Sequence, residues 1–284
     1  MSEDNRSKRS MRRREFLRNA ACAAGAMAAP WLVPASALGR DSAKKAPNER
    51  IGVAIVGLGS IAGCTQMPTR EEAAKGLRLA EPQSEGSGHL QVFGKHPDTQ
   101  VVALCDVNRH RLKVSEKLAE QVIGQKGFCC TTDFRELLED PAVDAMVVAT
   151  PDHWHTPITV AACQHGKDVY CEKGLALTVA DGRAIAGAVE RYGRVFQYGS
   201  QSRSIPELWA VCKLVREGVL GEVSEVTLEW GAPLRACDLP PMPAPEHIDW
   251  EMWLGPAPWR PYHPVLAHAH WRGYEDFGGG ILDV

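Results

Sequence analysis

The stretch IGVAIVGLGSIA at residues 51–62 decides the fold. Its first six residues form an unbroken apolar run, which is typical of a strand buried on both faces of a parallel sheet. A G-x-G-x-x-A pattern follows directly. In such a turn the first glycine allows the bend, the second lets the backbone approach a pyrophosphate, and the small third residue lets a helix pack on the strand. The pattern predicts dinucleotide contacts at Gly57, Gly59, Ser60, Ile61 and Ala62.

Alternating apolar runs and amphipathic segments continue to about residue 221 and predict a Rossmann-type, doubly wound parallel sheet in an α/β fold. Strands are expected at residues 51–56, 101–105, 128–130, 143–150, 168–171 and 195–198. Helices are expected at 89–96, 157–165 and 205–217, and after the capping pairs Asp133/Glu136 and Thr178/Asp181. Beyond this region Val223, Val226 and Leu228 predict the first strand of a second α/β domain with an open sheet. We therefore expect a dinucleotide-binding domain at 51–175 and the start of a substrate and oligomerisation domain at 176–284.

An acidic residue, Asp106, ends the second expected strand. A carboxylate at this place accepts hydrogen bonds from the ribose hydroxyls and repels a 2′-phosphate, which favours NAD over NADP as the cofactor. Arg109 and Arg111 follow closely and weaken that preference. Along the sequence, Gly57 and Asp106 are separated by many more residues than the roughly twenty of the usual fingerprint. This excess indicates an insertion, which we place at about residues 63–87.

Polar side chains follow the fourth and fifth expected strands, at the sheet edge where ligands bind in open parallel sheets. Thr150, Pro151, His153 and His155 follow the fourth strand, and we expect them to contact the cofactor and substrate. Two histidines on one turn without further ligands disfavour a metal site.

Glu172 and Lys173 follow the fifth strand. A lysine at a ligand-facing strand end loses hydration unless it has a partner or a role, and one with a lowered pKa can assist proton transfer on a hydroxyl. An ordinary ion pair at the surface between Glu172 and Lys173 is the alternative.

These motifs together resemble the Gfo/Idh/MocA family, the relatives of glucose-fructose oxidoreductase and inositol dehydrogenase. The resemblance extends through YCEKGLAL at 170–177, FQYGSQSRS at 196–204 and DWEMWLGPAPWRPYHP at 249–264. It implies hydride transfer between NAD or NADP and a secondary alcohol of a sugar or cyclitol. It further implies that Lys173 is the catalytic lysine, with Glu172 as its neighbour, and that the second domain covers the nicotinamide and makes oligomer contacts.

The chain departs from this family's pattern in two further places. Gly174 replaces the proline that follows the family's catalytic lysine, which is expected to loosen the geometry of the turn. The family's D-x-G-x-H-x-x-D segment is only begun, and Asp283 is expected to be its first, catalytic aspartate in a chain that is incomplete or a degenerate copy. Two other functions stay open: an NAD-dependent glycosidase that uses transient oxidation and elimination, and a non-catalytic protein that binds cofactor or sugar.

The N-terminus resembles a twin-arginine export signal. Arg12 to Arg14 precede an alanine-rich apolar run and an A-x-A cleavage pattern at Ala35 to Ala37. We therefore expect a signal peptide at 1–37, a linker at 38–50 and a periplasmic or otherwise exported protein. The apolar run is too short for a stable membrane helix.

The overall composition points to a small neutral ligand. A net charge of −3 gives no basic surface for nucleic acid, and the nine cysteines show no paired spacing that would indicate zinc or a disulfide framework. The tryptophans at 250, 253, 259 and 271 fit either a rim that stacks on carbohydrate or packing at the domain junction.

Overall fold

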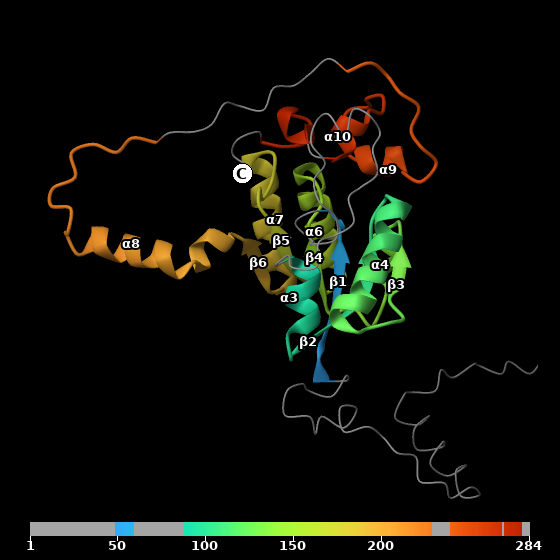
Figure 1. Cartoon of the computed structure of the whole chain (residues 1–284), viewed down its shortest axis with the longest axis horizontal. Coiled ribbons are helices and arrows are strands. Elements are labelled where there is room, and N and C mark those ends of the chain that lie inside the picture. Colours follow the sequence, from blue (N-terminus) through green and yellow to red (C-terminus); the bar gives the residue numbers. More distant parts are fainter. Residues whose placement is uncertain (1–48, 60–87, 229–238, 269, 280–284) are drawn as a thin grey trace, which may run out of the picture.

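The computed structural model describes residues 49–59, 88–228, 239–268 and 270–279. A six-stranded parallel sheet forms its centre, in the order β3-β2-β1-β4-β5-β6 (Figure 1). This is the strand order of a doubly wound dinucleotide-binding fold, so the predicted fold class is confirmed. The strands are β1 Ile51–Val56, β2 Thr99–Cys105, β3 Cys129–Thr131, β4 Ala145–Val148, β5 Asp168–Glu172 and β6 Phe196–Gly199.

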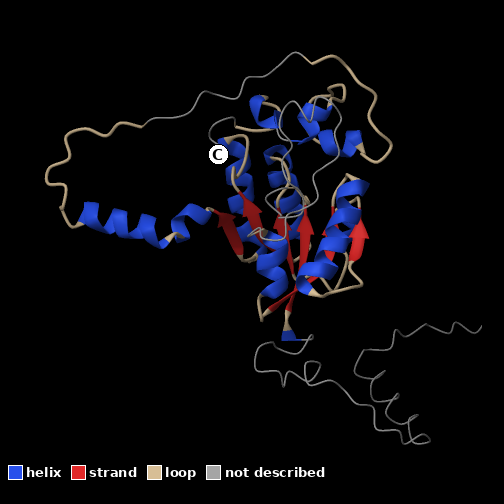
Figure 2. Cartoon of the chain, in the orientation of Figure 1, coloured by secondary structure: helices blue, strands red, loops and turns tan. Residues whose placement is uncertain are grey.

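Helices connect the strands and follow the sheet (Figure 2). They are α3 His89–Lys95, α4 Arg109–Ile123, α5 Arg135–Leu138, α6 His155–Gln164, α7 Val179–Tyr192, α8 Pro206–Arg216, α9 Trp250–Leu254 and α10 Pro264–His268. Among them, none combines the length and the apolar character that crossing a membrane requires.

The core has two layers because helices cover both faces of the sheet. On one face α3 and α4 bury Leu90 and Leu118 against β1 and β2. On the other face Ile158 of α6 and Ala188 of α7 join β4 and β5. This double cover explains why β1 is an apolar run, with only Ile51 exposed.

The helix boundaries follow from local capping signals. The side chain of Asn108 accepts hydrogen bonds from two amides of the first turn of α4. Thr178 caps α7 by accepting from the Asp181 amide, as the sequence predicted. Both helices end at a glycine in the left-handed conformation, Gly124 and Gly193.

The second half of the chain differs from the expectation in two ways. The parallel sheet runs on through α7 and β6 to Gly199, so the boundary expected at residue 175 lies inside this sheet. The strand expected at Val223, Val226 and Leu228 does not form, and these side chains are exposed. No described strand lies beside this segment, so its backbone has no ladder partner. In Figure 1, α8 projects away from the sheet before this segment begins.

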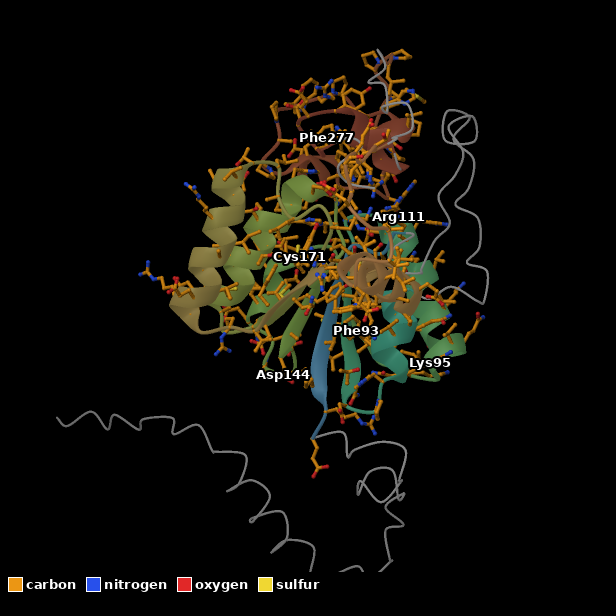
Figure 3. The ribbon with its side chains drawn as sticks, turned by 90° about the vertical axis from the view of Figure 1, so that its left-hand side faces the viewer. Phe93, Lys95, Arg111, Asp144, Cys171 and Phe277 are labelled. Atoms are coloured by element: carbon orange, nitrogen blue, oxygen red, sulfur yellow. The ribbon has the colours of Figure 1, made fainter. Side chains whose placement is uncertain are left out.

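Residues 239–268 and 270–279 lie above the carboxyl ends of the strands (Figures 1 and 3). They have their own aromatic core, in which Trp250 and Trp253 stack with ring centroids 4.6 Å apart. Trp271 is also buried, whereas Trp259 is 75% exposed. The packing interpretation is therefore confirmed for three of the four tryptophans. Backbone hydrogen bonds join this aromatic segment to the first residues after β2.

Phe277 is expected to stabilise the aromatic segment strongly, because its ring is fully buried against His153 and Trp253. Phe277→Ala should lower the free energy of unfolding by about 3–5 kcal/mol, measured by urea denaturation followed by circular dichroism. Trp259→Ala removes an exposed ring and should change it by no more than about 0.5 kcal/mol. Equal losses in the two variants would contradict this packing.

Candidate dinucleotide site

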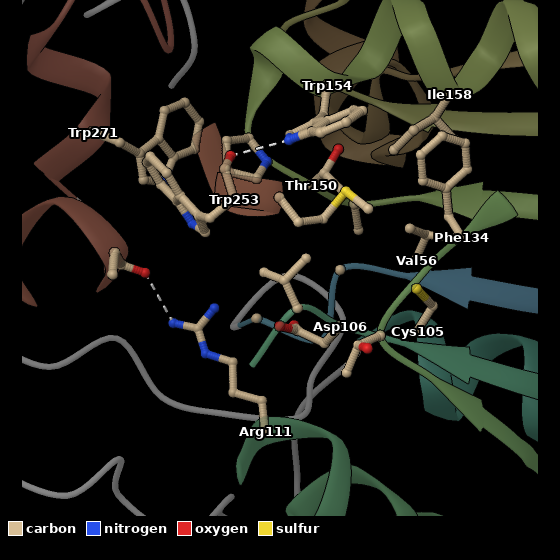
Figure 4. Close-up of a pocket in the computed structure, with 18 of the residues that line it drawn as sticks. Val56, Cys105, Asp106, Arg111, Phe134, Thr150, Trp154, Ile158, Trp253 and Trp271 are labelled. Carbon is tan, nitrogen blue, oxygen red and sulfur yellow. Dashed lines mark hydrogen bonds between the residues drawn. The ribbon is translucent and has the colours of Figure 1, made fainter. Parts of the chain in front are cut away.

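A cavity lies at the carboxyl ends of β1, β2 and β4, beneath the aromatic segment (Figure 4). Its floor includes Gly57, Asp106 and Thr150, and its roof includes Trp253 and Trp271. Of the predicted contacts, Gly57, Gly59, Asp106, Thr150 and Pro151 line this cavity. Ser60, Ile61, Ala62 and Asp283 lie outside the described residues.

Gly57 forms the turn that ends β1. Its φ of +90° is a conformation that side chains rarely adopt. A Cβ atom at this position would lie 2.6 Å from the carbonyl oxygen of Ala149. Glycine is therefore required twice, for the backbone angle and for the close approach of β4. The result is a bend with no side chain between it and the cavity.

The Asp106 carboxylate is a buried, hydrogen-bonded group of the cavity floor. It is 7% exposed. Oδ2 accepts a hydrogen bond from the Leu58 amide at 2.8 Å, and Oδ1 accepts one from the Asn108 amide at 2.8 Å. An ionised carboxylate has about four acceptor positions, so it retains capacity for a ligand's hydroxyls. The two amides fix its direction and join the glycine turn to the end of β2.

Only one of the two arginines after Asp106 faces the cavity. Arg111 lines it, and a terminal nitrogen donates to the carbonyl oxygen of Ala267 in the roof at 3.3 Å (Figure 4). A Cβ atom at Gly59 would lie 4.0 Å from the same guanidinium. Arg109 instead reaches the carbonyl oxygen of Glu246. A cation therefore lines the same cavity as the Asp106 carboxylate.

Thr150 gives a direct test of whether a polar ligand fits this cavity. Its Oγ1 is buried and has no hydrogen-bond partner in the structure. A buried hydroxyl without a partner costs about 1–3 kcal/mol. A ligand with a polar group at this wall of the cavity would remove that cost. The Thr150 hydroxyl, the Gly57 backbone and the Asp106 carboxylate together make this cavity suitable for a dinucleotide.

His153 does not line the cavity but holds its roof. Its Nε2 lies 3.0 Å from the Trp253 carbonyl oxygen, and its Nδ1 lies 3.4 Å from that of Phe277. Burial lowers the pKa of His153 to about 4, so the ring is neutral near pH 7 and can donate only one of these bonds. Trp154 Nε1 donates to the same Trp253 oxygen at 3.0 Å (Figure 4).

His155 also lies outside the cavity lining, and it connects two loops. The ring is fully buried. Its Nε2 lies 2.9 Å from the Thr150 carbonyl oxygen, and its Nδ1 lies 2.5 Å from that of Gly174. Both partners are acceptors, so a neutral ring donates only one of these bonds. A proton on Nδ1 gives the bond to Gly174, which joins the loop after β4 to the loop after β5.

Glu172 and Lys173 stand at the end of β5, outside the cavity lining. Glu172 is 2% exposed, and its carboxylate contacts His89 of α3 rather than the cavity. Burial raises the pKa of Glu172, but hydrogen bonds and charge from His89, the Lys173 amide and Tyr170 lower it more, so it stays below its ordinary value. Lys173 is half-buried. The peptide bond between Lys173 and Gly174 is cis.

Comparison with known families gives the site a context. Residues 51–200 match the family model described as "Oxidoreductase family, NAD-binding Rossmann fold", and residues 207–284 match its "C-terminal alpha/beta domain". The chain belongs to the Gfo/Idh/MocA oxidoreductase family. Six parallel strands and a C-terminal segment of this family are thus combined in one chain.

Curated members of the family are similar over part of their length. A glycosyl hydrolase family 109 protein from Shewanella sp. strain MR-4 is 28% identical over 218 residues, which is 74% of this chain and 44% of that protein. An inositol 2-dehydrogenase/D-chiro-inositol 3-dehydrogenase from Lactiplantibacillus plantarum is 32% identical over 141 residues, 48% of this chain and 38% of that protein. The chain thus spans less than half the length of these two relatives.

Solved structures of the family also align. A 3-ketoreductase from Actinomadura kijaniata with NADP and TDP-benzene is 22% identical, with a TM-score of 0.47 over 61% of this chain and 44% of that one. A myo-inositol 2-dehydrogenase from Lactobacillus plantarum is 22% identical, with a TM-score of 0.45 over 61% of this chain and 43% of that one.

Two features of this Gfo/Idh/MocA site go beyond the sequence prediction, which left open whether the tryptophans stack on a ligand or pack at the domain junction. The roof residues Met252, Trp253 and Trp271 line the cavity, and His89 holds Glu172. The sequence did carry a signal for the first, because Trp250 and Trp253 are three residues apart after Asp249, which caps α9. For the second, Tyr170 and Glu172 share one face of β5. This indicates that a helix packs on that face, but it does not identify the residue that contacts Glu172.

The depressed pKa of His153 predicts a pH dependence of stability. Only the unfolded chain takes up this proton between pH 6.5 and pH 4, so stability is full above pH 6.5 and falls by up to about 3 kcal/mol toward pH 4. His153→Gln keeps a donor for Trp253 but does not titrate. The free energy of unfolding of His153→Gln, relative to that of the wild type, should therefore rise as the pH falls. Urea unfolding at each pH measures this difference. Gln164→Ala at the exposed end of α6 removes no titratable group and provides the control, since its curve should stay parallel to wild type. Parallel curves for His153→Gln and wild type would disprove the assignment.

Proposed function

We propose that this chain binds NAD in the cavity and transfers a hydride between the nicotinamide and a secondary alcohol of a sugar or cyclitol. One observation carries the proposal: the Asp106 carboxylate is fixed by the amide that follows Gly57. The diphosphate-binding bend and the ribose-binding acid are thereby held as one unit beside the buried Thr150 hydroxyl. NADP is the less favoured cofactor because of the charge of Asp106, and Arg111 reduces that preference.

The residues have separate tasks in this proposal. The backbone at Gly57 and Gly59 approaches the diphosphate, and Asp106 accepts from the ribose hydroxyls. Thr150 and Pro151 form the wall beyond β4. When bound, the nicotinamide supplies the hydride acceptor or donor. His153 and His155 contribute indirectly, by fixing the roof and the loop at Gly174.

Lys173 is proposed to hold or move the hydroxyl proton of the substrate. It follows β5 at the carboxyl edge of the sheet, where ligands bind in such folds. Asp283 is proposed as a second catalytic group on the basis of its motif alone.

The arginine and alanine patterns of residues 1–37 support the further proposal that the protein is exported by the twin-arginine route.

A glycosidase that reuses its NAD is the second candidate. The similarity to the glycosyl hydrolase family 109 protein covers 74% of this chain. The roof over the cavity is tied down by His153 and Trp154, which favours a cofactor that stays in place between turnovers. Oxidation followed by reduction at the same nicotinamide would leave no net reduced cofactor.

Nucleotide binding tests what the two candidates share. Titration with NAD should quench tryptophan fluorescence, because Trp253 and Trp271 line the cavity, and NADP should bind more weakly. Asp106→Asn should weaken NAD binding about tenfold or more, because hydrogen bonds to a charged group are lost. Glu190→Gln on the exposed side of α7 is the control and should bind as wild type does. If neither nucleotide binds, both candidate functions are excluded.

Turnover separates the candidates. With a panel of polyols and sugars, the dehydrogenase should accumulate NADH in step with the ketone product. With glycosides, the glycosidase should release free sugar without accumulating NADH. Lys173→Met should abolish either activity and leave NAD binding within about twofold. A Lys173→Met variant with full turnover would remove the lysine from the mechanism.

A further inference from the structure

A buried histidine–glutamate pair lies beside Lys173. His89 Nε2 is 2.8 Å from Glu172 Oε1, and the two side chains are only 12% and 3% exposed. His89 is the first residue of α3, and Glu172 is the last residue of β5. The pair therefore joins α3, the first described helix after the glycine turn, to β5, which ends directly before Lys173.

The direction of this hydrogen bond follows from the charge of Glu172. The pKa of Glu172 lies below its ordinary value despite burial, so the carboxylate is ionised at neutral pH and can only accept. His89 Nε2 therefore carries the hydrogen that it shares with Oε1. An ionised carboxylate this deeply buried requires such a donor, because an unpaired buried charge is strongly destabilising.

Aromatic packing leaves the His89 ring little freedom. Its centroid lies 5.1 Å from that of Tyr170 in an edge contact and 6.1 Å from that of Phe93. The Tyr170 hydroxyl also donates to Glu172 Oε1, at 3.4 Å. From the other side β6 packs closely, since a Cβ atom at Gly199 would lie 3.0 Å from the Glu172 Cα. Glu172 is thus confined on two sides.

The second carboxylate oxygen passes this constraint on to Lys173. Glu172 Oε2 accepts a hydrogen bond from the Lys173 amide at 3.1 Å. That bond fixes the peptide plane at which Lys173 leaves the sheet. The contacts therefore form a continuous path from His89 through both oxygens of Glu172 to the Lys173 backbone.

We propose that His89 is a positioning residue for Lys173. It does not touch the substrate, and it acts by holding Glu172 ionised and in one orientation. This inference rests on the proposed proton-handling role of Lys173. It adds a residue whose loss should change Lys173 without changing the nucleotide-binding cavity, because His89 does not line that cavity.

The test compares His89→Leu, which removes the donor, with His89→Gln, which places an amide donor near the position of Nε2. His165→Leu is the matched control, because His165 forms a similar pair with Glu139 (3.2 Å) but on the exposed end of α6. The first readout is the rate at which acetic anhydride labels Lys173 as a function of pH, measured by peptide mass spectrometry. This readout needs no substrate, so it separates failure of this inference from failure of the proposed function. The second readout is the dissociation constant for NAD.

His89→Leu should shift the midpoint of the Lys173 labelling profile by at least about half a pH unit and lower kcat at least about tenfold. The NAD dissociation constant should stay within about twofold, and His89→Gln should restore most of the wild-type profile. His165→Leu should match wild type throughout. If His89→Leu does not fold, His89→Asn serves instead, because its amide ends short of Glu172. A wild-type labelling profile in the variant without the donor, or a failure of His89→Gln to restore the profile, would overturn the inference.

Discussion

The Asp106 carboxylate is the constraint on which the rest of the site depends. It accepts from the amides of Leu58, just after β1, and Asn108, just after β2. A carboxylate oriented by two amides is ready to accept from a ribose without reorganising. The bond from Leu58 also fixes the glycine turn beside the cavity, and Asn108, which donates the other bond, caps α4, the helix that carries Arg111. Fold and binding chemistry therefore meet at one side chain.

Three histidines each connect two segments of the chain around the cavity. His153 connects the aromatic roof to the end of β4, His155 connects the β4 loop to the β5 loop, and His89 connects α3 to Glu172. Each ring lies against oxygen acceptors in a buried setting, where a hydrogen bond lost from either partner is costly. The cavity itself is lined instead by glycine backbone, a carboxylate, a hydroxyl and indole rings. Such a lining suits a ligand that is polar at one end and aromatic at the other.

The sequence predicted the features that depend on neighbouring residues. The β1 run, the Gly57 bend, the acid at the end of β2 and the Thr178 cap are local patterns, and the structure has each of them. The histidine contacts join residues 83 and 100 positions apart, and no local pattern specifies such pairs. The prediction of a strand at Val223 was wrong for a related reason. Alternation shows that a segment is suited to a sheet, but a strand forms only where a partner strand lies beside it.

Hydrogen–deuterium exchange with and without NAD tests the central claim most directly, because it locates the bound nucleotide on the chain. The account predicts slower exchange in peptides that cover residues 51–59, 104–108 and 149–151, where the cavity floor lies. It also predicts that Asp106→Asn removes this protection at the same NAD concentration. Protection confined to α6 and α7, which line a separate groove at Pro157, Val160 and Asp181, or no protection anywhere, would contradict it.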